Sequence, residues 1–143
     1  MNLRQCAGWL AGLWAGEIVC VGGLAAPAAF ATLARPDAGR FVGRVFQQDA
    51  YVALALAVLL LLLERRQGRE GAPVFSVNVM LLLGALFCVV AGYFAVLPLM
   101  AQARAGEGGM SFMALHLVST VFFAAKGLMV AVLAWRYAGR GPA

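Results

Sequence analysis

The sequence predicts an all-α, polytopic membrane protein, a bundle of four transmembrane helices in a single domain. Three observations support this prediction. Of the 143 residues, 64% are hydrophobic and only 12% are charged, and the mean hydropathy is +0.89. A soluble domain is normally about half apolar and about a quarter charged. The apolar residues gather in long stretches between short polar connectors, and four spans of about 20 residues use up nearly the whole chain.

This composition also excludes several classes of protein. It does not fit a secreted disulfide scaffold, a disordered chain or a soluble nucleic-acid binder. The formal charge of +5 comes from arginines in the expected loops, where they suit anionic lipid, and no nucleic-acid partner is expected. Cys6, Cys20 and Cys88 have no CxxC spacing, so they predict neither a disulfide framework nor a zinc site.

The four long apolar stretches define the expected spans. We place them at about residues 7–34, 48–63, 73–100 and 111–135. The first stretch is too long for the apolar region of a signal peptide and contains Glu17, so it predicts a transmembrane helix. Pro27 predicts a kink in its second half, which transmembrane helices tolerate.

A polar connector, residues 35–49, leads from the first expected span into the second. Pro36 and Asp37 are typical of a helix start. Apolar residues recur at helical spacing on the face opposite Arg40 and Arg44. They are Phe41, Val42, Val45 and Phe46. The pattern predicts a short amphipathic helix that lies at the membrane interface and leads into the second span.

The loop arginines predict the orientation in the membrane. With four spans, the N-terminus, the second loop and the C-terminus share one side, and that side carries more arginines than the other. These arginines are Arg4, Arg65, Arg66, Arg69, Arg136 and Arg140 on the first side, and Arg35, Arg40, Arg44 and Arg104 on the second. The positive-inside rule therefore places both termini in the cytoplasm.

Few ionisable side chains fall inside the expected spans, and each costs several kcal/mol in hydrocarbon unless it is paired or hydrated. Glu17 and Lys126, the only lysine, each lie about ten residues from the same face of the membrane. We therefore expect an ion pair between them, direct or through water. The pair could lock two helices together or take part in chemistry, and the structural role is the simpler one. Alternatively, Lys126 could extend toward the cytoplasmic face.

His116 is the only histidine, and it lies about one turn into the fourth span, just before Ser119 and Thr120. Asp49 opens the second expected span at a comparable depth, so a contact between His116 and Asp49 near the outer surface is expected. The histidine could handle protons or serve as one ligand of a metal or haem. A hydrogen-bonded interfacial histidine is the simpler interpretation. Asn78 is a further polar residue at membrane depth.

Gly8, Gly12 and Gly16 form a GxxxGxxxG pattern, which Gly23 continues. Small residues at this spacing let helix backbones approach closely. The glycine face could pack inside the bundle or mediate a homo-oligomer.

The sequence contains no nucleophile elbow, phosphate-binding loop, zinc motif or pair of catalytic carboxylates. We therefore expect a non-enzymatic accessory or interaction protein that resides in the lipid bilayer and needs no cofactor. The alternative is a metal- or haem-associated or proton-coupled membrane protein. It would be centred on His116 with Asp49, joined by Glu17 and Lys126, and copper or haem would be its cofactor.

Two segments resemble a known family. They are Gly22-Gly23-Leu24-Ala25-Ala26-Pro27-Ala28-Ala29-Phe30-Ala31-Thr32-Leu33 and Ala38-Gly39-Arg40-Phe41-Val42-Gly43-Arg44-Val45-Phe46. They resemble the first half of the bacterial domain of unknown function 4149, which is itself similar to eukaryotic transmembrane protein 205. The strongest pieces are the Ala-Pro-x-x-Phe pattern of Pro27 and Phe30 and the Gly-Arg-x-Phe pattern of Arg44 and Phe46.

The resemblance continues near the C-terminus, where Phe112, His116 and Ser119 match an F…H..S pattern of the family. It implies a four-span protein of the bacterial inner membrane without an established activity. A looser similarity to copper-resistance D-type and related haem-associated four-span proteins concerns the fold alone, because those relatives use several histidines.

Overall fold

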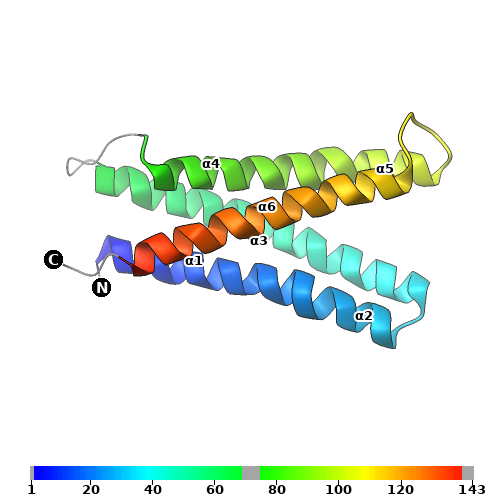
Figure 1. Ribbon diagram of the computed structural model, residues 1–143, viewed down its shortest axis with the longest axis horizontal. Helices are drawn as coiled ribbons and strands as arrows, with labels where there is room; N and C mark the ends of the chain where they lie inside the picture. Colours follow the sequence, from blue (N-terminus) through cyan, green and yellow to red (C-terminus); the bar gives the residue numbers. More distant parts are fainter. Residues whose placement is uncertain (1, 69–74, 140–143) are drawn as a thin grey trace.

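The computed structural model describes residues 2–68 and 75–139, and every regular element in those ranges is a helix (Figure 1). The elements in chain order are α1 (Leu3–Val19), η1 (Cys20–Ala25), α2 (Ala26–Thr32), α3 (Arg35–Gly68), α4 (Val77–Val89), η2 (Val90–Ala95), α5 (Val96–Arg104) and α6 (Phe112–Ala138). The short elements η1 and η2 are π-helical turns that continue the helices on either side of them.

Four continuous helices are long and apolar enough to cross a membrane, which confirms the predicted fold class. They are Leu3–Thr32, Arg35–Gln67, Val77–Arg104 and Phe112–Ala138. The first two are longer than expected, because the capped helix of α1 already begins at Leu3 and the second helix already begins at Arg35. The protein is therefore a multi-pass membrane protein with an all-helical transmembrane bundle.

The separate interfacial helix that was expected between the first two spans is instead the first part of α3. Pro36 lies in the first turn, where the missing proline N–H costs nothing, and Ala34 O already accepts from Ala38 N at 2.9 Å. No proline interrupts the chain between Asp37 and Asp49, so the amphipathic segment and the second span form one rod. Asp49 consequently lies well inside a helix and not at its start.

Each odd-numbered span contains one π turn, and a proline follows each turn at a short distance. η1 precedes Pro27 and η2 precedes Pro98. A proline within a helix lacks an N–H and its ring clashes with the carbonyl four residues earlier, so the widened turn absorbs the mismatch. The kink expected at Pro27 thus takes the form of a π turn, and the third span repeats the arrangement.

The four spans form a ring in which α3 and α6 occupy opposite corners. Helix α1 contacts α3 and α6, and α4 contacts the same two helices (Figure 1). The core is rich in alanine, and its residues recur at helical spacing on α1 and α3. These core residues are Ala7, Ala11, Trp14 and Ile18 on α1, and Ala50, Ala53, Ala57 and Leu60 on α3. Small side chains let the backbones approach closely, as in other membrane bundles.

Helix α6 packs directly against both π turns. A Cβ added at Gly22 in η1 would lie 2.7 Å from Phe123 Cε1, and one added at Gly92 in η2 would lie 2.5 Å from Phe122 Cβ. These two adjacent phenylalanines of α6 therefore fit against the glycines of the two turns. The Phe122 Cβ cannot move away without its backbone, so Gly92 is the less tolerant position.

We expect Gly92→Ala to destabilise the bundle by about 1–3 kcal/mol, because it overpacks a close contact. Gly23→Ala is the matched control, since its added Cβ meets only Val19 Cγ1 at 4.0 Å. Thermal unfolding in detergent micelles measures both. Equal unfolding temperatures for the two variants would contradict the close approach of α6 to η2.

Candidate functional site

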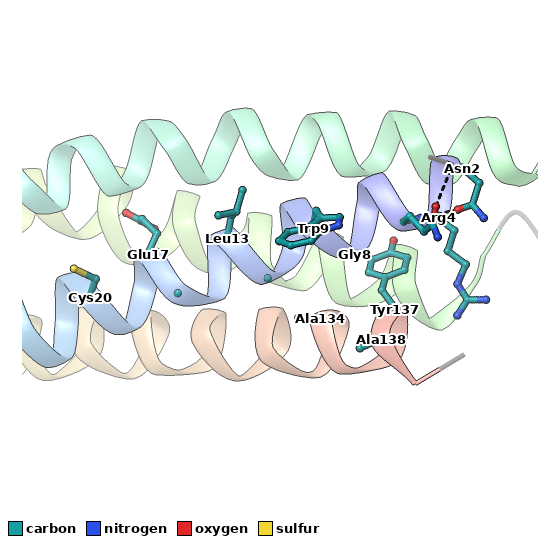
Figure 2. Close-up of a pocket in the computed structure, with 13 residues that line it drawn as sticks. Asn2, Arg4, Gly8, Trp9, Leu13, Glu17, Cys20, Ala134, Tyr137 and Ala138 are labelled. Atoms are coloured by element: carbon teal, nitrogen blue, oxygen red, sulfur yellow. Dashed lines mark hydrogen bonds between the residues drawn. The ribbon is translucent and has the colours of Figure 1, made fainter. Parts of the chain in front are cut away.

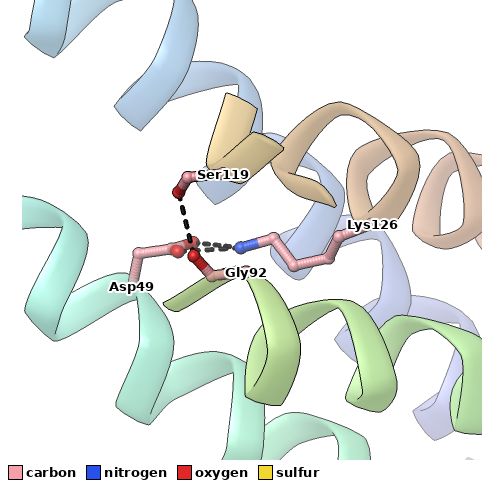
Figure 3. Close-up of polar contacts among 4 residues, drawn as sticks. All are labelled: Asp49, Gly92, Ser119 and Lys126. Atoms are coloured by element: carbon pink, nitrogen blue, oxygen red, sulfur yellow. Dashed lines mark hydrogen bonds and ion pairs between the residues drawn. The ribbon is translucent and has the colours of Figure 1, made fainter. Parts of the chain in front are cut away.

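The most deeply buried charges of the described residues are Asp49 on α3 and Lys126 on α6, which form an ion pair (Figure 3). The Lys126 Nζ donates to Asp49 Oδ1 at 2.8 Å and to Asp49 Oδ2 at 2.7 Å. The Lys126 side chain is 3% exposed and the Asp49 side chain is 5% exposed. Because α3 and α6 lie at opposite corners, this pair crosses the centre of the bundle.

The expected partner of Lys126 was Glu17, and the structure corrects this. Lys126 lies at membrane depth and bonds to Asp49, so it does not extend to the cytoplasmic face either. Glu17 lies on α1 and is half-buried. Its Oε2 atom is buried and has no hydrogen-bond partner within residues 2–68 and 75–139. The direct partner of Lys126 is therefore Asp49 and not Glu17.

The expected contact between His116 and Asp49 is also wrong, because the two residues lie at different depths. Asp49 is roughly 21 Å along α3 from its start, and His116 is only roughly 6 Å along α6. His116 is exposed, and its ring stacks on Phe112 with centroids 6.1 Å apart. Among the residues that the structure describes, no group of three or more His, Cys, Asp or Glu side chains could hold a metal ion.

Ser119 and Phe123 of α6 make two further contacts in the neighbourhood of the ion pair. The Ser119 Oγ donates to the Gly92 carbonyl oxygen in η2 at 2.9 Å (Figure 3). The Lys126 Nζ lies 4.5 Å from the centroid of the Phe123 ring, a distance at which a cation–π attraction operates. Ser119, which was predicted as a polar candidate beside His116, thus ties α6 to the π turn of the third span.

A second polar cluster lies near the end where α1 begins and α6 ends. The Tyr137 hydroxyl and the Asn78 Nδ2 both donate to Glu64 Oε1, the latter at 3.1 Å. The Arg136 Nε donates to Asn78 Oδ1 at 2.8 Å, and the Ser76 hydroxyl donates to Glu64 Oε2 at 3.4 Å. Like the ion pair, this cluster joins α3 to α6, and it also includes α4.

Of this cluster, the sequence singled out only Asn78. Glu64 directly precedes Arg65 and Arg66, so it was assigned to a basic loop and not to the end of a helix. Tyr137 lies beyond residue 135, where the fourth span was expected to end, although its side chain is buried. The available signal was spacing, because Glu64 follows Asp49 at a separation close to four helical turns and therefore lies on nearly the same face.

A groove of about 910 Å³ runs along α1 beside the end of α6 (Figure 2). The small residues Gly8, Gly12 and Gly16 lie along it, with Ala134 on the α6 side. A Cβ at Gly8 would meet Tyr137 Cβ at 3.3 Å, whereas one at Gly12 or Gly16 would meet nothing within 4 Å. The GxxxG pattern therefore packs inside the bundle only at its first residue, and the rest of it, like Gly23, is exposed.

The residues that carry the family resemblance lie on α2 and on the first part of α3, close to the connection between these two helices. Pro27 and Phe30 of α2 are exposed, and Arg44 Nη1 donates to Gln47 Oε1 at 2.7 Å. Phe46 packs edge-on against Phe123 with ring centroids 5.0 Å apart. Of these four residues, only Phe46 makes such a contact with another span. The other three are exposed, so most of the residues that carry the resemblance lie at the protein surface.

Comparison with protein families gives a match over residues 9–108 to the model described as a domain of unknown function, DUF4149. The match covers more than half of the chain. The protein belongs to the DUF4149 family. No curated protein and no solved structure matches the chain, so similarity to transmembrane protein 205 stays a prediction.

The DUF4149 match contains most, but not all, of the polar residues described above. Glu17, Asp49 and Glu64 lie inside the matched residues. His116 and Lys126 lie on α6, beyond the match. The ion pair therefore joins a residue inside the DUF4149 match to one outside it.

Asp49→Asn and Lys126→Met are each expected to cost about 3–5 kcal/mol of stability, because each leaves a buried charge without its partner. The double variant removes both charges and should recover most of the loss. Unfolding free energies in detergent or in bicelles measure the effect. A double variant as unstable as the sum of the single variants would refute the pair. Glu17→Gln combined with Lys126→Met is the control, and it should show no comparable recovery.

Tyr137→Phe should destabilise the protein by about 1.5–3 kcal/mol, since it removes a hydrogen bond to a carboxylate at a buried position. Tyr51→Phe is a suitable control, because Tyr51 is 56% exposed. Its expected effect is within about 0.5 kcal/mol of zero. If both variants unfold like the unmodified protein, the second cluster contributes no stability.

Proposed function

We propose that this DUF4149 protein is a non-enzymatic accessory protein of the bacterial inner membrane, and that it acts by binding a partner within the bilayer. The groove along α1 is the observation that carries the proposal. It holds about 910 Å³, and two of its glycines have nothing within 4 Å of an added Cβ. Trp9 and Leu13, which line the same groove, are 70% and 64% exposed. A surface of this kind accepts a rod-like apolar partner at close range.

The interior polar groups support an accessory role over a chemical one. Lys126 has both carboxylate oxygens of Asp49 as acceptors, and Glu64 accepts from Tyr137 and Asn78. Buried groups that are bonded to one another in this way stabilise a geometry. On this proposal the protein works without haem or copper.

The metal- or haem-associated alternative, centred on His116, has weaker support. The imidazole is exposed and lies against Phe112, far along α6 from the buried charges. Haem binding usually needs an enclosed apolar pocket and an axial ligand on the appropriate face. A Soret band or stoichiometric copper in the purified protein would favour this alternative.

The proposed orientation places both termini in the cytoplasm, following the arginine distribution. The start of α1 and the end of α6 lie at one end of the bundle (Figure 1), where Arg4 Nη2 donates to the Arg136 carbonyl oxygen at 3.4 Å. The groove begins at this end. Its opening therefore lies at the cytoplasmic surface in the proposed orientation.

Gly12→Leu should block the groove without disturbing the core, because its side chain enters open space. Native mass spectrometry of protein released from membranes in mild detergent measures what stays bound. We expect the unmodified protein to carry additional mass and Gly12→Leu to lose most of it, about tenfold or more. Gly43→Leu is the matched control, since Gly43 also has nothing within 4 Å. A bare monomer in all three samples, or equal retention by all three, would contradict the proposal.

A further inference from the structure

The two ends of the α1 groove differ in chemistry. The end near the start of α1 is polar and positively charged, with Asn2, Arg4 and Gln5 along it (Figure 2). The remainder is lined by glycine, alanine and apolar side chains until Glu17. A groove with one cationic end and an apolar length matches a molecule with an anionic head and an apolar tail.

We infer that the α1 groove is a binding site for one anionic phospholipid of the cytoplasmic leaflet, with the phosphate at Arg4 and an acyl chain along Gly8, Gly12 and Gly16. This inference rests on the proposed function and names the partner of the same site. The lipid phosphate would meet the guanidinium at the membrane surface, and the acyl chain would cover the exposed glycine face.

The length of the groove fits this occupant. Arg4 and Glu17 are thirteen positions apart, which is about 20 Å along an α-helix. One leaflet of hydrocarbon is about 15 Å thick. The apolar part of the groove therefore spans a leaflet, and Arg4 lies at the level of the head groups.

The charge at the open end is held in place. Arg4 Nη2 donates to the carbonyl oxygen of Arg136, a contact that is partly buried, and this uses one of the five guanidinium donors. The remaining donors match a phosphate, which guanidinium binds in a bidentate manner. Arg4 also lies in the first turn of α1, where the helix dipole favours a negative ligand.

The charged residue at the deep end of the groove, Glu17, does not extend into the space proposed for the acyl chain. The Oε2 atom of Glu17 is buried, although the residue itself lines the groove. In Figure 2 the Glu17 side chain points from α1 to the side where α3 lies, away from α6. The carboxylate therefore turns toward the bundle, and Glu17 marks the end of the apolar part of the groove that begins beyond Gln5.

A second copy of this chain fits the groove less well than a lipid does. Two copies in one membrane share the same orientation, and an isologous interface along α1 would place each residue near its own copy. Arg4 would then approach Arg4. Two guanidinium groups brought together at the membrane surface repel each other, which disfavours this arrangement.

Brominated lipids test the inference through Trp9, which is 70% exposed at the groove. The protein with Trp135→Phe is reconstituted into phosphatidylcholine bilayers that contain brominated phosphatidylglycerol or, in parallel, brominated phosphatidylcholine. Trp14 is 0% exposed, so Trp9 is the tryptophan that faces lipid in this variant. We expect phosphatidylglycerol to occupy the site about fivefold in preference to phosphatidylcholine, since one arginine near the surface contributes about that factor.

Arg4→Gln should reduce the preference to about one. Arg65→Gln is the control, because it removes the same charge from an exposed position at the end of α3 and should leave the preference unchanged. Equal quenching by the two lipids in the Arg4-containing protein would overturn the inference. So would an equal loss in both variants, which indicates general surface charge.

Oxidative crosslinking of Leu13→Cys, in protein whose free Cys6, Cys20 and Cys88 are replaced by alanine, separates failure of this inference from failure of the proposed function. Efficient disulfide-linked dimers with no lipid preference would assign the groove to a second copy, so the lipid inference fails and the proposed function survives. Little crosslinking with a preference for phosphatidylglycerol supports the lipid. Little crosslinking without a preference for phosphatidylglycerol rejects the lipid inference. The proposed function is then decided by native mass spectrometry, which shows whether the unmodified protein retains more bound mass than Gly12→Leu.

Discussion

The Asp49–Lys126 ion pair determines how the four spans are arranged. Neither charge is stable in hydrocarbon alone, so α3 and α6 must present these residues to each other across the bundle. The Glu64–Tyr137 contact joins the same two helices near the end of the bundle where α1 begins and α6 ends. Two links at different levels fix both the rotation and the relative height of α3 and α6. Helices α1 and α4 then fill the two remaining corners, and each contacts both linked helices.

Glycine has two different uses in this bundle. Gly22 and Gly92 lie in the π turns, where phenylalanines of α6 approach so closely that a Cβ does not fit. Gly12 and Gly16 face open space on α1 and leave a groove at the bundle surface. Gly22 and Gly92 allow close packing against α6. At Gly12 and Gly16 an added Cβ would meet no atom within 4 Å, so these two glycines are not required for packing within the single chain. This contrast is why we assign partner binding to α1.

Hydropathy and length predicted correctly that four helices are long and apolar enough to cross a membrane, because a membrane imposes both on every crossing helix. The side-chain pairing was predicted less well. Asp49 was assigned to the outer end of a span that was thought to start near Gln48, so it was matched with His116 by depth. Once α3 begins at Arg35, Asp49 lies deep enough to meet Lys126. The depth of a charged residue depends on the helix boundary, and an amphipathic start such as residues 35–46 conceals that boundary.

The glycine pattern illustrates a different difficulty. GxxxG indicates a close approach of helices, and it holds equally for a neighbour within the chain and for an external partner. A Cβ added at Gly8 would meet Tyr137 of α6, whereas one added at Gly12 would meet nothing within 4 Å, although the two glycines are about one helical turn apart. The packing of α1 against α6 decides between these outcomes, and the glycine spacing alone does not reveal it.

Solid-state NMR in lipid bilayers tests the central ion pair most directly, because Lys126 is the only lysine and gives a single Nζ signal. In protein labelled with ¹⁵N-lysine and side-chain ¹³C-aspartate, we expect strong Nζ–Cγ dipolar dephasing, which Asp49→Asn labelled in the same way should abolish. The same lysine labelling with side-chain ¹³C-glutamate should give weaker dephasing. Absent dephasing from aspartate, or stronger dephasing from glutamate, would contradict the arrangement described here.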